Sequence, residues 1–229
     1  MRYPRKDRIY YGLMLSSVGQ RGYPARYTRD EVFAAAVELL DEAPDAPLTM
    51  KGLATRLEIA PMTLYGYVAN KEALLEGVAA IVFDGIFAGI PVDASWDEQV
   101  RQQTLTIHSV VVRHPGLTRA LRAHQSPNPS LFRVREDMLA TLERAGFPPH
   151  AALDAMGILT AYAQGFAAVQ AGGLAADELP DRIRRLPQDE FPLLHRCADD
   201  YAGHISDRSF EHGLNLLLAG LRDELAEFG

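Results

Sequence analysis

Residues 57–75 read LEIAPMTLYGYVANKEALL, and this segment contains the signals that separate two short helices from a longer one. Pro61 can occupy the first turn of a helix, because the N–H that proline lacks has no helical partner there. Asn70 is a favourable N-cap for the helix that follows. The segment therefore predicts a brief helix over about 61–68 and another that begins at Lys71.

The residues before this segment predict two further helices. Thr28 and Glu31 have the spacing of a capping box, and the apolar positions from Val32 to Leu40 then recur with a helical period. Thr49 is a favourable N-cap for a short second helix. A short helix, a tight connection and a second short helix that carries hydroxyl and aromatic side chains match the plan of a DNA-binding helix-turn-helix. An ordinary helical corner would show the same spacing.

The rest of the chain also reads as helical, with no strand pattern. Helical periodicity covers about 96–113, 117–124, 130–145, 149–171 and 209–227, with a loop and a helix near 191–201 expected between the last two. We predict an all-α protein. A basic arm over 1–26 that could be disordered precedes a three-helix helix-turn-helix domain over 27–75 and a larger helical effector-binding and dimerisation domain over 76–229.

Charge is distributed unevenly along the chain. The formal net charge is −7, but residues 1–29 contain seven basic groups and one acidic group, a net of +6, which leaves −13 for the remainder. A local basic field can steer a polyanion to an otherwise acidic protein, although a solvated tail has the same composition. The single cysteine, Cys197, excludes an internal disulfide, favours a cytoplasmic location and is expected to be inert. No continuous apolar run approaches the ~20 residues of a membrane span, so no membrane partner is expected.

Residues 28–78 resemble the TetR family of transcriptional regulators. Its DNA-binding signature is matched in register by a set of six residues: Thr63, Leu64, Tyr65, Val68, Lys71 and Leu74. Two positions depart from the pattern. Tyr67 stands where a histidine is usual, and Glu58 replaces a glycine common in the turn, where a left-handed backbone would be strained.

The resemblance implies which residues contact double-stranded DNA. Those expected at phosphates are Lys51, Thr63, Tyr65, Tyr67 and Lys71, with Pro61 and Met62 at base edges and Arg26 and Arg29 as further contacts. Such a division is physically reasonable, because phosphate contacts set the register while groups at base edges discriminate sequence. Leu64 should instead pack the helix onto its own domain.

The later part of the chain resembles the C-terminal domain of the tetracycline-repressor branch. The motifs concerned are Ser95-Trp96, His114-Pro115-Gly116, Ala145-Gly146-Phe147 and the closing Phe210 to Leu214. The resemblance implies an effector pocket formed by Phe87, Gln103, Ile107, His108, Leu121, Met138, Tyr162, Gln164 and Phe166. The metal-ligating histidine of that branch falls on Leu121, so we expect no metal, no cofactor and a largely apolar effector.

The helices predicted over 149–171 and 209–227 also carry apolar stripes. Together these stripes present more apolar surface than packing within one compact bundle requires. We predict that they pair with their copies in a homodimeric four-helix interface. The predicted contacts are Ala155, Leu159, Phe210, Leu214, Leu217, Leu218 and Leu221. The alternative is core packing within a single chain.

Together these features predict a repressor that a small effector releases from a palindromic operator. An activator of the same fold, or a helical scaffold protein that does not bind DNA, remains open as an alternative. No nucleophile elbow, phosphate-binding glycine loop or metal-ligand spacing is present, and the seven histidines are scattered, so we do not expect an enzyme.

Overall fold

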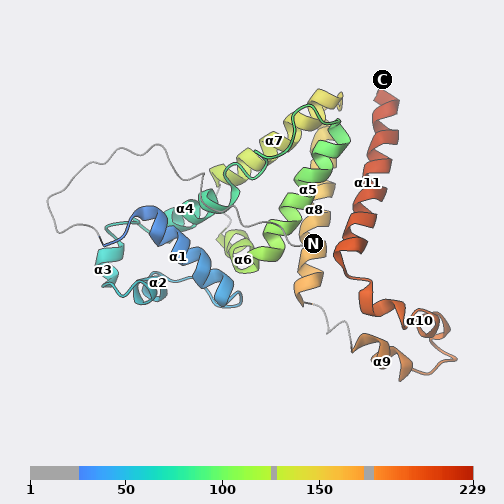
Figure 1. Ribbon diagram of the computed structural model, residues 1–229, viewed down its shortest axis with the longest axis horizontal. Helices are drawn as coiled ribbons and strands as arrows, with labels where there is room; N and C mark the ends of the chain where they lie inside the picture. Colours follow the sequence, from blue (N-terminus) through green and yellow to red (C-terminus); the bar gives the residue numbers. More distant parts are fainter. Residues whose placement is uncertain (1–25, 125–127, 173–177, 229) are drawn as a thin grey trace.

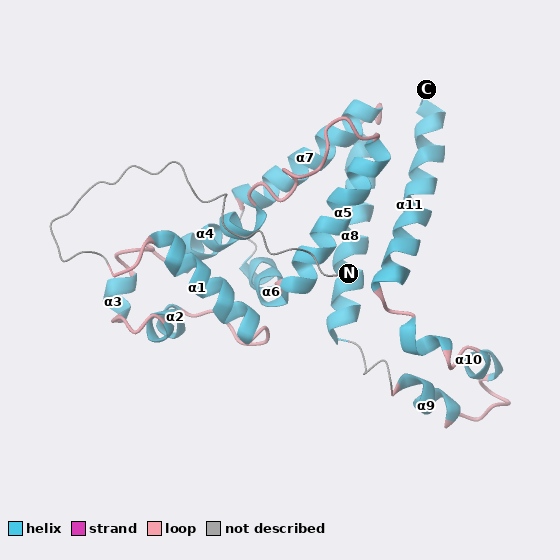
Figure 2. Ribbon diagram, viewed as in Figure 1, coloured by secondary structure: helices cyan, strands magenta, loops and turns pink. Residues whose placement is uncertain are grey.

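The computed structural model describes residues 26–124, 128–172 and 178–228. Within these ranges all regular structure is helical and no strand occurs, which confirms the predicted all-α fold (Figure 2). The basic arm over 1–26 lies outside the described residues except for Arg26.

Four helices form the N-terminal part of the molecule: α1 (Arg29–Glu42), α2 (Met50–Arg56), α3 (Pro61–Leu64) and α4 (Lys71–Phe83). Their predicted caps are present. The Thr28 hydroxyl accepts a hydrogen bond from the Glu31 N–H while the Glu31 carboxylate accepts one from the Thr28 N–H, and the side chains of Thr49 and Asn70 accept bonds from Gly52 and Ala73. Helix α3 ends at Leu64, earlier than predicted, and a series of turns continues to Tyr67.

The larger part of the molecule is a bundle of long helices (Figure 1). They are α5 (Trp96–Arg113), α6 (Pro115–His124), α7 (Pro129–Ala145), α8 (Pro149–Gly172) and α11 (Asp207–Phe228). Helix α5 packs against α7 and α8, and α11 packs along α5 and α8. These helices match the predicted ranges to within two residues at each end.

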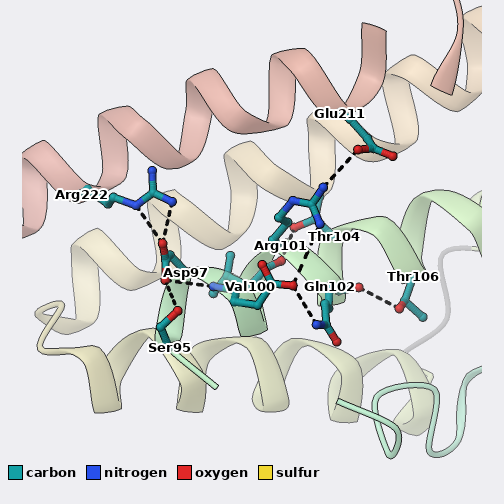
Figure 3. Close-up of polar contacts among 10 residues, drawn as sticks. Ser95, Asp97, Val100, Arg101, Gln102, Thr104, Thr106, Glu211 and Arg222 are labelled. Carbon is teal, nitrogen blue, oxygen red and sulfur yellow. Dashed lines mark hydrogen bonds and ion pairs between the residues drawn. The ribbon is translucent and has the colours of Figure 1, made fainter. Parts of the chain in front are cut away.

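Ion pairs at both ends of the contact hold α11 on α5 (Figure 3). The Arg222 Nε and Nη2 atoms lie 2.8 and 2.5 Å from Asp97 Oδ2, and Arg101 Nη2 lies 3.1 Å from Glu211 Oε2. The hydroxyl of Ser95 and the Arg222 guanidinium hold the pKa of the Asp97 carboxyl below its usual range, because each donates a hydrogen bond to the charged form. The contact is polar at its rim.

Between α8 and α11 the chain forms two short helices and a 3₁₀ helix, where a loop and one helix were predicted. These are α9 (Leu179–Arg184), α10 (Pro192–Arg196) and η1 (Asp200–Gly203). They project from the bundle and pack on each other, burying Ile183 and Ala198 (Figure 1). Cys197 is exposed here, so the inertness expected of this thiol cannot come from burial.

Helix α4 runs without interruption across the boundary predicted at 75/76. It packs on α1 on one side and on α7 on the other. The contact with α1 is close: a Cβ at Gly77 would lie 2.2 Å from the Phe33 ring. The two domains therefore share a helix rather than meeting at a linker, and the division at this position remains a proposal.

Helix α6 is the second connection between the two parts of the molecule. A Cβ at Gly116 would lie 2.2 Å from the Leu40 carbonyl oxygen, so the backbones of α6 and α1 are in direct contact. Two polar contacts flank this point: His114 Nδ1 lies within hydrogen-bond distance of Asp41 Oδ2, at 2.9 Å, and an ion pair joins Arg119 Nη1 to Asp45 Oδ1 at 2.5 Å.

Candidate nucleic-acid interface and effector site

Helix α3 has one buried anchor and an exposed outer face. Leu64 is fully buried in the core formed with α1 and α2, whereas Met62 is 79% exposed and Tyr65 is 47% exposed. Pro61 and Thr63 are also exposed. Large apolar side chains left in solvent on a four-residue helix are typical of a recognition surface, because burying them would serve the fold better.

The turn before α3 contains a strained residue. Glu58 has φ of 52°, the only positive φ at a non-glycine position among the described residues. The Glu58 N–H bonds to Thr55 O and the Ile59 N–H to Ala54 O, which is the Schellman pattern that normally places glycine at this position. The left-handed conformation considered from the sequence is therefore present, with glutamate in place of glycine.

A network of tyrosines holds the turn before α3 together with residues 61–68, which we call the recognition segment. The Tyr27 hydroxyl donates to Leu57 O at 2.9 Å, and the Tyr67 hydroxyl accepts from the Tyr27 N–H at 3.3 Å. Arg26 pairs with the exposed Glu58 carboxylate at 3.3 Å. Tyr67 thus ties the start of α1 to the end of the recognition segment, while its O–H remains able to donate to a phosphate.

The remaining basic residues predicted at DNA lie in solvent. Arg29, Lys51 and Lys71 are exposed at or near the N-terminal ends of α1, α2 and α4. Arg56, a further exposed cation at the end of α2, is neutralised by Glu42 at 2.7 Å and Glu38 at 3.2 Å. The structure thus leaves Lys51 and Lys71, rather than Arg56, available on this side of the protein.

The nine residues predicted to form one effector pocket do not lie together. Gln103, Ile107 and Met138 are buried between α5 and α7. The Gln103 amide donates to the Thr141 hydroxyl at 3.0 Å, while its Oε1 is buried without a partner among the described residues. Arg144 of α7 donates to the same Thr141 hydroxyl at 3.3 Å and to Gln99 Oε1 of α5 at 3.4 Å, so the interface between α5 and α7 contains several polar contacts.

A second group forms an aromatic cluster between α5, α8 and α11. The ring of Phe210 stacks between His108, with centroids 3.8 Å apart, and Tyr162, at 5.0 Å. Phe166 packs against the same rings. Burial lowers the pKa of His108, since it disfavours the charged imidazole, although a hydrogen bond from His108 Nε2 to Gln170 acts in the opposite sense. These rings contact one another and so serve as core.

The other three predicted pocket residues lie apart from both groups. Phe87 is partly buried in the turn after α4, and Leu121 faces a small hollow beside α4. Gln164 accepts a hydrogen bond from Arg122 on α6 at 2.7 Å. The nine residues thus lie among different neighbours in this structure, and their assignment to one effector pocket remains a prediction.

The predicted dimer stripe faces the interior of the chain. Six of its seven residues are buried in the single protomer, namely Ala155, Leu159, Phe210, Leu214, Leu218 and Leu221, and Leu217 is partly buried. In the single protomer α11 packs on α5 and α8 through this stripe, so a homodimeric contact at these positions remains a proposal.

The outer face of α8 is largely apolar and exposed, and α11 adds a few exposed apolar positions beside it. On α8 this face contains Leu153, Gly157, Ile158, Ala161, Gly165, Ala168 and Val169, and on α11 it contains Leu216 and Gly220. Ile158 is 50% exposed and Leu216 is 63% exposed. We call these residues the α8–α11 face. Sequence periodicity could not separate it from the core, because α8 is apolar on nearly every side.

Helix α8 also has the length and composition of a membrane-spanning helix. Its segment Pro149–Ala171 has a mean hydropathy of 1.2 and is one-third buried. The continuous-run criterion applied to the sequence did not detect it. A core helix with an apolar interface on its outer side has the same composition.

No cluster of three potential metal ligands (His, Cys, Asp or Glu) occurs among the described residues.

The exposed helix-turn-helix followed by a helical bundle defines a class: DNA-binding regulators with a helical regulatory domain. The family described as "Tetracyclin repressor-like, C-terminal domain" matches residues 90–225, more than half of the chain. The chain belongs to this family and is a TetR-family transcriptional regulator.

Individual relatives support this assignment over most of the chain. The tetracycline repressor protein class D of Escherichia coli is 27% identical over 203 residues, which cover 88% of this chain and 92% of that protein. Apo ActR from Streptomyces coelicolor superposes with a TM-score of 0.73 at 28% identity and covers 90% of this chain and 100% of ActR. The complex of ActR with actinorhodin gives a TM-score of 0.70.

Proposed function

We propose that this regulator is a repressor that binds a palindromic operator as a homodimer and is released by a small, largely apolar effector. The observation that carries the proposal is the contrast over residues 62–65: Leu64 of α3 is fully buried, while Met62 of α3 and Tyr65, the residue that follows the helix, are exposed. The buried Leu64 side chain holds α3 on its domain, and the exposed side chains of Met62 and Tyr65 are then free to contact DNA.

DNA recognition is divided among three kinds of side chain. Met62 and Pro61, at the start of α3, supply apolar contacts of the kind that pack on thymine methyl groups. Thr63, Tyr65 and Tyr67 supply hydroxyl groups that can donate to phosphates, and Lys51 and Lys71 add positive charge. Arg26 and Arg29 extend the same side toward the basic N-terminal arm.

The α8–α11 face supplies the dimer contact in this proposal. Glycine and alanine along α8 permit a close helix approach, and Ile158 and Leu216 supply apolar area. Asp154 is the only Asp, Glu, Lys or Arg residue in α8, so pairing the α8 part of the face with its copy buries little charge. A two-fold dimer of this kind can place its recognition helices about one DNA turn, roughly 34–36 Å, apart.

The contact between α5 and α7 is the proposed effector site. Gln103 Oε1 is buried without a hydrogen bond among the described residues, and leaving such an acceptor unsatisfied costs about 1–3 kcal/mol. Ile107 on α5 and Met138 on α7 are buried apolar side chains of the same two helices. An apolar effector with one hydroxyl or N–H group would satisfy the acceptor, and it would release DNA if it binds the DNA-free arrangement more tightly.

The first experiment is selection of bound duplexes from a random DNA library, followed by titration of the selected site at several salt concentrations. A palindromic site whose affinity falls steeply with salt is the expected result. Failure of folded protein to enrich any duplex would contradict DNA binding and favour a scaffold. Transcription in vitro from the selected site then separates a repressor from an activator.

A further inference from the structure

A groove between α6 and α8 lies apart from the proposed effector site. It has a volume of about 220 Å³, and its floor is formed by Val111, Ala167, Ala168 and Ala171. Thr118, Arg119 and Arg122 of α6 form one wall, and Gln164 of α8 lies opposite. This groove has two guanidinium groups beside an apolar surface, whereas the interface around Gln103 has a buried amide and a single arginine, Arg144, that bonds to Thr141 and Gln99.

The two arginines differ in their partners. Arg122 Nη2 donates to the neutral amide oxygen of Gln164 at 2.7 Å, and no carboxylate within the described part of the chain pairs with it. The hydrogen bond holds the guanidinium at the groove without neutralising its charge. Arg122 therefore presents an oriented cation beside an alanine-lined surface, which is the complement of an anion attached to an apolar body.

Arg119 already pairs with a carboxylate that a ligand could replace. Its partner Asp45 lies in the connection between α1 and α2, and both side chains are largely exposed. Exposed ion pairs contribute little to stability because solvent screens them, so a ligand carboxylate in the groove can exchange with Asp45 readily. The exchange would remove the Arg119–Asp45 ion pair, one of the two polar contacts that flank the contact of α6 with α1.

We propose that the groove binds a small carboxylate with an apolar body, about the size of an alkylbenzoate. Arg122 and Arg119 bind the carboxylate, and the alanine floor contacts the ring. The volume lies below the roughly 300–1,000 Å³ of drug-sized pockets, which restricts the ligand to a single ring or a short alkyl chain. Ala168 lies at the edge of the α8–α11 face, so the groove opens beside the proposed dimer contact.

The test is calorimetric titration of the full chain, without DNA, with 4-ethylbenzoate and with its uncharged analogue 4-ethylbenzamide. We expect the carboxylate to bind and the amide to bind at least tenfold more weakly. Arg122→Gln should weaken carboxylate binding by about tenfold or more, because charge-assisted hydrogen bonds are among the strong ones. Arg113→Gln, which removes an exposed arginine outside the groove, is the matched control and should bind like wild type.

A second variant tests the location without removing charge. Ala171→Phe should fill the groove and block binding, while thermal unfolding and light scattering report that the fold and the oligomeric state are unchanged. Equal binding of acid and amide, or carboxylate binding that survives both Arg122→Gln and Ala171→Phe, would overturn the proposal.

The link to DNA is measured separately, on the selected duplex. The carboxylate should change the DNA affinity of wild type, and Asp45→Asn should reduce that change, because the ion pair the ligand displaces is already absent. An identical change in both proteins would overturn the coupling through Arg119. Because the calorimetric titration contains no DNA, failure to find an operator would count against the proposed function and not against this site.

Discussion

Replacing Glu58 with glycine should give a more stable protein than replacing it with alanine, because both changes remove the ion pair with Arg26 but only glycine relieves the left-handed backbone. A non-glycine residue in the left-handed region costs about 1–2 kcal/mol, and Glu58 has φ of 52°. Glycine removes this strain but adds about 0.5–1 kcal/mol of backbone entropy to the unfolded chain. The loss of the exposed pair with Arg26 costs about 0–1 kcal/mol.

These terms predict an order of stability among three proteins. Glu58→Ala keeps the strain and loses the pair, so it should fall slightly below wild type. Glu58→Gly should unfold with a free energy about 0.5–1 kcal/mol above that of Glu58→Ala, which corresponds to roughly 1–4 °C in Tm for a chain of this size. Urea unfolding at low salt and at 0.5 M NaCl is the assay, because salt screens the ion pair and leaves the strain.

High salt should move Glu58→Gly above wild type. If the glycine variant is no more stable than the alanine variant at either salt concentration, the turn does not hold a left-handed residue and the reasoning fails. Glu58→Asn provides a further check, because asparagine tolerates this conformation better than alanine.

Three other predictions concern DNA, the dimer and pH. Tyr65→Ala should weaken binding to many duplexes about equally in fluorescence polarisation and leave the dimer intact; unchanged affinity would contradict its assignment to a phosphate. Ile158→Glu combined with Leu216→Glu should give monomers in analytical ultracentrifugation, whereas Phe132→Glu, at an exposed residue of α7, should not; a persisting dimer would move the interface elsewhere. Burial holds the pKa of His108 below its unfolded value of 6.5, so the unfolded chain binds more protons and stability should fall as pH drops below about 6.5. His108→Phe should lose less stability than wild type between pH 7.5 and 5.5, and equal losses would remove His108 as the cause.

Local signals in the sequence predicted local structure well. Thr28, Thr49 and Asn70 cap the helices they were expected to cap, because a cap depends on a side chain and on backbone groups two or three residues away. Helix α9 was not predicted, and α10 was predicted only as part of one longer helix near 191–201. Segments of five or six residues that begin near proline carry little periodic signal.

Contacts between helices were harder to predict. The stripe from Phe210 to Leu221 was correctly identified as apolar, but periodicity does not say whether the covering surface belongs to the same chain or to a partner. The effector residues were dispersed for a similar reason. Gln103 and His108 lie on one helix, yet they face α7 and α11 respectively, and only tertiary packing makes that distinction.

The backbone contact at Gly116 limits how the two parts of the molecule can move. Helices separated by a layer of side chains can slide past each other by small rotamer changes, which is shear motion. No such layer exists where Gly116 meets Leu40 O, so the available motion is a swivel about that point. We therefore expect a small displacement of the far end of α6 to rotate α1 about this contact. The resulting displacement should increase with distance from Gly116 toward the recognition segment.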